Sequence, residues 1–183
     1  QGDDDSKSLL SLILTPTREL ALQIQEHLLP CAKVMDVTIA AIVGGISEQK
    51  QKRFLSNRPD IVVATPGRLW NLLSMGNEYL SKLHLLRFLV LDEADKMLNL
   101  GFKAEMDKIF NFLPKKRQNL LFSATLSEKV NNINQVLLDN PAVIKIASEE
   151  NNIDLINQSA YYINEDKKGP LLRYLIKHNN MQQ

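Results

Sequence analysis

Leu89-Val90-Leu91-Asp92-Glu93-Ala94-Asp95 joins three apolar residues directly to a cluster of carboxylates. The apolar residues indicate a buried strand, which would hold Asp92 rigidly at its carboxyl end, where Mg²⁺ and its waters can sit, as a Walker B site requires. Glu93 is then placed to orient and deprotonate a water for attack on a γ-phosphate. For this stretch alone, the alternative interpretation is a solvated turn in which Asp95 caps a helix.

The rest of the chain alternates strands and helices around this stretch. Short apolar runs, often β-branched, predict buried strands at 10–14, 39–43, 61–64, 88–91, 120–122 and 143–146. Amphipathic patterns predict helices at 18–34, 48–55, 68–74, 103–113 and 127–138. The tail adds a possible strand at 158–163 and a helix at 167–178. Alternating strands and helices favour right-handed crossovers, so the predicted fold class is α/β with a mainly parallel sheet and helices on both faces.

Two of the predicted strands are followed by turns that combine Thr, Pro and Arg. Thr15-Pro16-Thr17-Arg18 follows the first strand, and Thr65-Pro66-Gly67-Arg68 follows the third. Thr can cap a helix and Pro suits the first helical position, but the positive end of the helix dipole opposes an Arg there. An anion bound at both helix starts would explain the repeated Arg, whereas two ordinary strand-to-helix turns would not.

Two further turns complete the pattern. Gly44-Gly45 follows the second strand and lets the backbone approach a ligand closely. Three phosphate-binding turns at the ends of successive strands predict a nucleic-acid backbone that crosses this edge of the sheet. In Ser123-Ala124-Thr125, two hydroxyl groups are spaced to hydrogen-bond Asp95. The alternative is that Thr125 or Ser127 only caps the next helix.

Composition limits the possible function classes. The chain has 183 residues, 44% hydrophobic and 23% charged, which excludes disorder as the whole answer and favours one ordinary domain. A net charge of +1 does not indicate nucleic-acid binding, so such binding depends on local placement of charge. No apolar run is long enough to span a bilayer. The single cysteine, Cys31, favours a reducing, intracellular compartment, either the cytoplasm or the nucleus.

Together these motifs resemble the DEAD-box family of ATP-dependent RNA helicases. Asp92-Glu93-Ala94-Asp95 spells the name of that family, and four more elements occur in its order. They are Pro16-Thr17-Arg18-Glu19-Leu20-Ala21, Gly44-Gly45, Thr65-Pro66-Gly67-Arg68 and Ser123-Ala124-Thr125. The resemblance covers residues 9–146 and implies a RecA-like domain of the P-loop NTPase type, the first of two such domains.

The resemblance also implies a role for each motif. Asp92 would hold Mg²⁺ mostly through water, and Glu93 would activate the attacking water. Asp95 would bond Ser123 and Thr125, linking the state of the nucleotide to RNA-strand separation. The residues implied to line the RNA-backbone path, with little sequence preference, are Pro16, Thr17, Arg18, Gly44, Gly45, Thr65, Gly67 and Arg68.

One element of the family pattern has no counterpart in these 183 residues. The sequence contains no Gly-Lys pair, so it holds no phosphate-binding loop ending Gly-Lys-Thr. We therefore expect 1–8 to be a variable stretch, 9–148 a partial RecA-like helicase domain 1, and 149–183 a linker and the start of helicase domain 2. On this interpretation, the parent protein uses ATP and Mg²⁺ to clamp and locally unwind RNA, and it does so together with the second RecA-like domain and away from membranes. The chain alone is expected to lack turnover. The alternative is a catalytically silent RNA- or partner-binding module.

Overall fold

The computed structural model describes residues 8–125, 127–146 and 159–178. The chain divides into two compact units, which we call unit 1 (Gln1–Pro141) and unit 2 (Ala142–Gln183). The sheet and the candidate site belong to unit 1. Within the described residues, no helix combines the length and the apolar character needed to cross a membrane.

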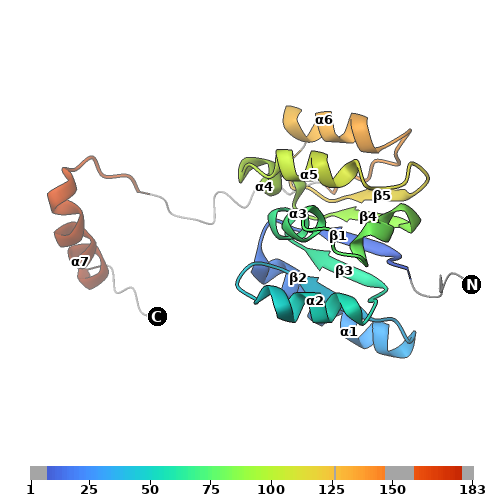
Figure 1. The fold of residues 1–183 in the computed structure, drawn as a ribbon. Helices are drawn as coiled ribbons and strands as arrows, with labels where there is room; N and C mark the ends of the chain where they lie inside the picture. Colours follow the sequence, from blue (N-terminus) through green and yellow to red (C-terminus); the bar gives the residue numbers. More distant parts are fainter. Residues whose placement is uncertain (1–7, 126, 147–158, 179–183) are drawn as a thin grey trace, which may run out of the picture. The chain divides into compact units, whose positions relative to one another are not determined.

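Unit 1 is built around a parallel sheet of five strands in the order β2-β3-β1-β4-β5 (Figure 1). The strands are β1 (Ser11–Leu14), β2 (Ile39–Ile42), β3 (Ile61–Ala64), β4 (Phe88–Leu91) and β5 (Gln118–Leu121). Neighbouring strands pair without offset, so that Leu14 lies beside both Ala64 and Leu91. All carboxyl ends therefore meet along one side of the sheet, which we call the C-terminal edge. The predicted α/β class with a mainly parallel sheet is confirmed.

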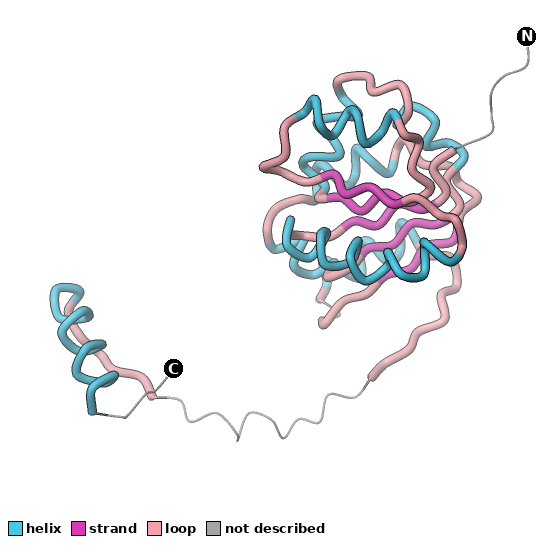
Figure 2. The backbone as a smooth tube through the Cα atoms, turned by 90° about the horizontal axis from the view of Figure 1, so that it is seen from below, coloured by secondary structure: helices cyan, strands magenta, loops and turns pink. Residues whose placement is uncertain are grey.

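Helices cover both faces of the sheet (Figures 1 and 2). On one face, α1 (Arg18–Val34) contributes Ala21 to a small core with Ile13, Val43 and Val63. On the other face, buried residues of the remaining helices pack with Leu12, Leu14, Leu89 and Leu91. These helices are α2 (Glu48–Ser56), α3 (Pro66–Ser74), η1 (Leu80–Leu85), α4 (Ala94–Asn99), α5 (Lys103–Phe110) and α6 (Glu128–Leu137). Alternate residues of a strand thus pack into the cores on opposite faces of the sheet, because successive side chains of a strand point to opposite faces.

Two strand predictions differ from the structure. β5 begins at Gln118, two residues before the predicted 120–122, because polar residues can pair on this half-exposed edge strand. The strand predicted at 143–146 is wrong: Val143, Ile144 and Ile146 lie exposed in irregular chain. A short apolar run forms a strand only where a neighbouring strand supplies hydrogen bonds and burial, and none pairs with 143–146 in the described part of the chain.

Unit 2 contains η3 (Glu165–Lys167) and α7 (Lys168–His178), and α7 agrees with the helix predicted at 167–178. The strand predicted at 158–163 is not formed by 159–163, and Gln158 lies outside the described residues. α7 has no buried residue. The predicted boundary between 148 and 149 stays a prediction, because residues 147–158 are not described.

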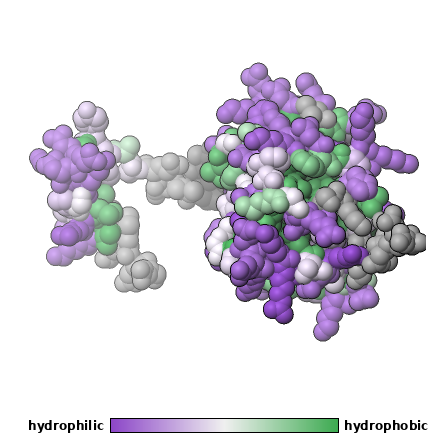
Figure 3. Space-filling view, viewed as in Figure 1, coloured by the Kyte–Doolittle hydropathy of each residue, from purple (hydrophilic) through white to green (hydrophobic). Residues whose placement is uncertain are grey.

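The visible surface of unit 1 is mainly hydrophilic, with apolar residues gathered near the middle of the view (Figure 3). Large apolar side chains of unit 1 that are at least 40% exposed include Phe88, Leu100 and Phe122. Isolated exposures of this kind are normal in globular proteins. They do not by themselves mark a site, so the search for one rests on the polar motifs.

Candidate functional site

Each motif singled out from the sequence lies just past the carboxyl end of a strand. In the order of the sheet, β2 is followed by Gly44-Gly45, β3 by 65–68, β1 by 15–18, β4 by Asp92-Glu93 and β5 by 123–125. Because the strands are parallel and unstaggered, the five turns lie side by side along the C-terminal edge. The glycine and arginine turns occupy the β2-β3-β1 half of this edge, and the carboxylate and hydroxyl turns occupy the β4-β5 half.

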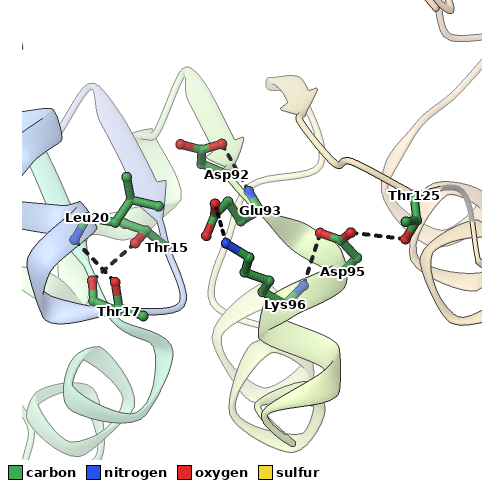
Figure 4. A network of polar contacts seen from close by, with 8 residues as sticks. All are labelled: Thr15, Thr17, Leu20, Asp92, Glu93, Asp95, Lys96 and Thr125. Carbon is green, nitrogen blue, oxygen red and sulfur yellow. Dashed lines mark hydrogen bonds and ion pairs between the residues drawn. The ribbon is translucent and has the colours of Figure 1, made fainter. Parts of the chain in front are cut away.

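Asp92 and Glu93 lie at the end of β4, between the ends of β1 and β5 (Figure 4). The Asp92 N–H donates to the Leu14 carbonyl at 2.9 Å, and Asp92 Oδ1 accepts from the Glu93 N–H at 2.9 Å. Glu93 has φ of 50° and ψ of 49°, a left-handed conformation that is uncommon for any residue except glycine. A backbone held in such a conformation by its surroundings often belongs to a functional site.

The two carboxylates have different electrostatic surroundings. Burial raises the pKa of the half-buried Asp92, and the neighbouring Glu93 charge adds to this, while the hydrogen bond from the Glu93 N–H opposes it. Glu93 Oε1 instead lies 2.7 Å from Lys96 Nζ in an exposed ion pair. The hydrogen bond to Glu93 raises the pKa of Lys96 in turn. Lys96 thus neutralises part of the Glu93 charge.

Asp92 fits the kind of metal site that the motifs imply. No group of three or more His, Cys, Asp or Glu side chains forms a metal cage within the described residues. Mg²⁺ does not require such a cage, because it usually keeps several waters and takes one or two carboxylates together with phosphates of a substrate. Asp92 uses Oδ1 for the Glu93 N–H, which leaves its other oxygen for a metal-bound water.

Asp95 joins the turns that follow β4 and β5. Its side chain is buried, and Oδ2 accepts from Thr125 Oγ1 at 3.0 Å, while Oδ1 accepts from the Lys96 N–H at 3.0 Å. Burial opposes ionisation of Asp95, but the hydrogen bonds from Thr125 and the Lys96 N–H outweigh it and hold its pKa below the usual value. Ser123 Oγ donates its one proton to the Thr125 carbonyl at 2.8 Å, which braces the turn itself.

The turn after β1 differs in one respect from the prediction. Thr17 is the N-cap of α1, and its Oγ1 accepts from the Leu20 N–H at 3.2 Å. Arg18 is therefore the first helical residue, in agreement with the helix predicted at 18–34, and Pro16 does not occupy the first helical position that it suits. The cause is the second threonine: Thr15 is fully buried and donates to the Thr17 carbonyl at 3.2 Å, so Thr17 is the one left to cap the helix (Figure 4).

Arg18 connects the turn after β1 to the turn after β2, although β3 lies between these strands. Gly45 has φ of +78°, and a Cβ added there would overlap the Arg18 guanidinium. The backbone conformation thus favours glycine at position 45. A larger residue there would also displace the Arg18 guanidinium, which is the end of an exposed side chain. Gly44 has no such constraint, because an added Cβ would have no atom within 4 Å.

In the turn after β3, Thr65 is the N-cap and Pro66, which suits this position, is the first residue of α3, so that the helix begins two residues before the predicted 68–74. Thr65 makes no side-chain capping bond. Arg68 Nε donates to Gln51 Oε1 at 2.9 Å, and Arg68 Nη1 donates to Asn71 Oδ1 at 3.0 Å. A Cβ added at Gly67 would make only an ordinary contact with Phe102, at 3.7 Å.

Sequence reasoning missed two residues of this half of the edge. Asn71 follows Arg68 by three positions on α3, a spacing at which helical side chains meet, so its contact could have been found. Gln51 lies 17 residues before Arg68 on another helix, and no sequence pattern relates the two. Only the fold brings them together.

Comparisons with known proteins give the same family as the motifs. A model of the DEAD/DEAH box helicase family matches residues 3–133. The probable ATP-dependent RNA helicase DDX47 of Mus musculus is 39% identical over 168 residues, which are 92% of this chain and 36% of that protein. The DEAD-box ATP-dependent RNA helicase 13 of Oryza sativa subsp. japonica is 44% identical over 155 residues, 70% of this chain and 19% of that protein. The ATP-dependent RNA helicase DDX24 of Pongo abelii is 48% identical over 126 residues. The chain spans between 15% and 36% of the length of these relatives.

Proposed function

The chain belongs to the DEAD/DEAH box helicase family, and from this premise we propose that its protein is an ATP-dependent RNA helicase. In this proposal ATP hydrolysis is coupled to clamping of the RNA backbone and to local unwinding of a duplex. The names of the relatives, all ATP-dependent RNA helicases, support the substrate and the nucleotide. The protein is proposed to work inside the cell, in the cytoplasm or the nucleus.

One observation carries the proposal: the two halves of the C-terminal edge have complementary chemistry. The β2-β3-β1 half offers the guanidinium groups of Arg18 and Arg68 at the starts of two helices, where phosphate oxygens are favoured. The adjoining β4-β5 half offers Asp92 and Glu93, which suit a nucleotide with its metal. An edge that binds RNA beside the place where ATP is hydrolysed is what coupling requires.

The β4 residues would divide the work of hydrolysis. Asp92 would hold Mg²⁺ mainly through bound water, and the metal supplies charge neutralisation at the phosphates. Glu93 would orient the attacking water and accept its proton, for which it must first leave Lys96. The ion pair between them is exposed, so separating it costs little.

The hydrogen bond between Asp95 and Thr125 is proposed to transmit the state of the nucleotide. It ties the turn that carries Asp92 and Glu93 to the turn after β5, and Ser123 braces that second turn. A change at the nucleotide would therefore move both turns together. This link is what we propose couples hydrolysis to RNA-strand separation.

The RNA path is proposed to follow the three turns of the β2-β3-β1 half. Its residues are Pro16, Thr17, Arg18, Gly44, Gly45, Thr65, Gly67 and Arg68. Arg18 and Gly44-Gly45 are exposed at this edge, and Arg68 is half-buried. Contacts to phosphate and sugar position a protein on nucleic acid without reading its bases, so little sequence preference is expected. We propose a second RecA-like domain of the same protein as the partner that closes over RNA and nucleotide, with 149–183 as its linker and beginning.

The test is the substitution Glu93→Gln in the full-length native protein. The amide keeps the shape of the side chain but cannot accept the proton, so RNA-stimulated ATP hydrolysis should fall by about 10²–10⁴-fold. ATP affinity should change little. Single-turnover hydrolysis and equilibrium nucleotide binding measure the two quantities.

The control is Glu26→Gln, which removes an exposed carboxylate from α1. It should hydrolyse ATP like the unsubstituted protein. Normal turnover in Glu93→Gln would remove Glu93 from the mechanism. If the unsubstituted protein binds RNA but never hydrolyses ATP, the alternative of a catalytically silent binding module replaces the helicase.

A further inference from the structure

Gln51 is a polar side chain with no exposed surface, and it lies between the turn after β2 and Arg68. Its position on α2 is fully buried. Gln51 Nε2 donates to the Val43 carbonyl at 2.5 Å and to the Ile46 carbonyl at 3.0 Å. These two residues flank Gly44-Gly45 on either side. Gln51 Oε1 accepts from Arg68 Nε at 2.9 Å.

These bonds satisfy both N–H groups and the oxygen of the buried amide. A buried amide without partners would be strongly unfavourable, so Gln51 has a preferred orientation that the Gly44-Gly45 turn determines. Gln51 Oε1 is thereby directed toward Arg68. Arg68 is consequently hydrogen-bonded to an amide that the Gly44-Gly45 turn holds in place.

The guanidinium of Arg68 keeps binding capacity in this arrangement. Two of its five N–H groups donate to Gln51 and Asn71, which leaves three for a ligand. A planar guanidinium fixed at its Nε side presents its remaining donors in one direction. Binding to a phosphate then costs less conformational entropy than it would for a freely rotating arginine.

We propose that Gln51 is a positioning residue, which uses the Gly44-Gly45 turn as an anchor to hold the Arg68 guanidinium ready for a phosphate of the RNA backbone. This inference rests on the proposed RNA binding of the same edge. It assigns to Gln51 no contact with RNA. The part of its effect on binding that passes through Arg68 is the part that disappears when the Arg68 side chain is removed.

The test is a double-mutant cycle with Gln51→Met and Arg68→Ala in the full chain. Met has nearly the same length and volume as Gln but neither donates nor accepts strongly. Binding of a short single-stranded oligouridylate is measured by fluorescence anisotropy at several salt concentrations. Arg68→Ala should weaken binding by about tenfold and reduce the salt slope by ~0.7 for one lost phosphate contact.

Gln51→Met should weaken binding severalfold in the otherwise unchanged chain. In the Arg68→Ala background the same substitution should have an effect at least about threefold smaller, because the group that it positions is already absent. Equal effects in both backgrounds would show that Gln51 acts on the fold and not through Arg68, and would overturn the proposal. Failure of the unsubstituted chain to bind oligouridylate would instead overturn the proposed RNA binding, and this inference with it.

Two further measurements separate positioning from general destabilisation. Leu55→Ala creates a cavity on the same helix and should lower stability without changing oligouridylate affinity at a temperature where the protein stays folded. If Gln51→Met does not fold, the unsubstituted chain still tests the proposal by NMR. The Arg68 Nε–H should exchange with solvent much more slowly than that of the exposed Arg53. Equal exchange rates would contradict a fixed guanidinium.

Discussion

Asp95 is a carboxylate that stays ionised in a buried position because Thr125 and the Lys96 N–H hydrogen-bond it. Its pKa is lower in the folded protein than the ordinary 3.8, although burial alone would raise it. A lowered pKa contributes stability above the pKa of the unfolded chain, and this stability is lost as the pH falls through the folded value. The contribution of Thr125 should therefore depend on pH.

The substitution Thr125→Val tests this dependence. It removes the Oγ1 donor and should lower the free energy of unfolding by about 1 kcal/mol at neutral pH. The difference from the unsubstituted chain should shrink as acid protonates Asp95, because the bond to an ionised carboxylate is the stronger one. Urea unfolding at about pH 7 and about pH 3 measures both values. Thr125→Ser keeps a hydroxyl donor and should behave like the unsubstituted chain, and a deficit that does not change with pH would contradict the assigned bond.

Individual residues also show where sequence reasoning about the site reaches its limit. Asp92, Glu93 and the Thr-Pro-Arg turns could be found because each lies beside its strand in the sequence. The left-handed backbone of Glu93 could not, since it depends on hydrogen bonds that the Asp92 and Ala94 N–H groups donate to the carbonyls of Leu14 in β1 and of Phe122 just after β5. The contacts of Arg18 with Gly45 and of Arg68 with Gln51 join turns that are distant in sequence. Local patterns identify the chemistry of such residues but not their partners.

At the scale of elements, strand predictions succeeded where both faces of the strand are buried, because a continuous apolar run then indicates a strand. β1, β2 and β3 show three consecutive buried residues, and their apolar runs gave their positions within one residue. β5 is half-exposed, so its polar first residues gave no strand signal. α4 was missed because it has only six residues, too few to show a helical period. The run at 143–146 has the composition of a strand but no neighbour to pair with.

The turn after β2 provides a prediction at this scale, because its two glycines differ in their constraints. Gly45→Ala should lower the free energy of unfolding by about 1–2 kcal/mol for the left-handed backbone. It should also displace Arg18 and weaken oligouridylate binding. Gly44→Ala is the matched control, since the space around it is open, and it should stay within about 0.5 kcal/mol of the unsubstituted chain. Urea unfolding compares the two, and equal stabilities would mean that Gly45 is not constrained as described.

At the scale of the molecule, the family could be read from the sequence because its motifs fall at the ends of parallel strands. A parallel sheet converts positions that are far apart in sequence into one edge, so a short motif after each strand suffices to build a site. The resemblance inferred from these motifs is confirmed by the family match over residues 3–133. The hydrogen bonds and contacts that hold the elements in place are made by residues between the motifs. These contacts follow from tertiary packing, and local sequence patterns do not indicate them.

One such connection involves Tyr79, which precedes η1 and is 8% exposed. Its hydroxyl donates to the Pro59 carbonyl at 2.6 Å and so ties the start of η1 to the chain before β3. Burial raises the pKa of Tyr79 to about 12, with the charge of Asp60 adding to this and that of Arg58 opposing it. The other tyrosines, at 161, 162 and 174, lie in unit 2, so Tyr79 is the tyrosine whose ionisation bears on the stability of unit 1.

The raised pKa makes the stability of unit 1 sensitive to alkaline pH. Above about pH 10 the unfolded chain releases the tyrosine proton while the folded chain retains it, so the free energy of unfolding should fall as the pH rises from 10 towards 12.

Tyr79→Phe leaves the Pro59 carbonyl without its donor and should lower the free energy of unfolding by about 1 kcal/mol at neutral pH. It has no proton to release, so its stability should fall less steeply over the same alkaline range. The two proteins differ only at residue 79, so the comparison between them isolates Tyr79. Parallel curves for the two proteins, measured by urea unfolding, would mean that Tyr79 ionises as easily in the folded protein as in the unfolded chain, and that the bond to Pro59 does not hold its proton.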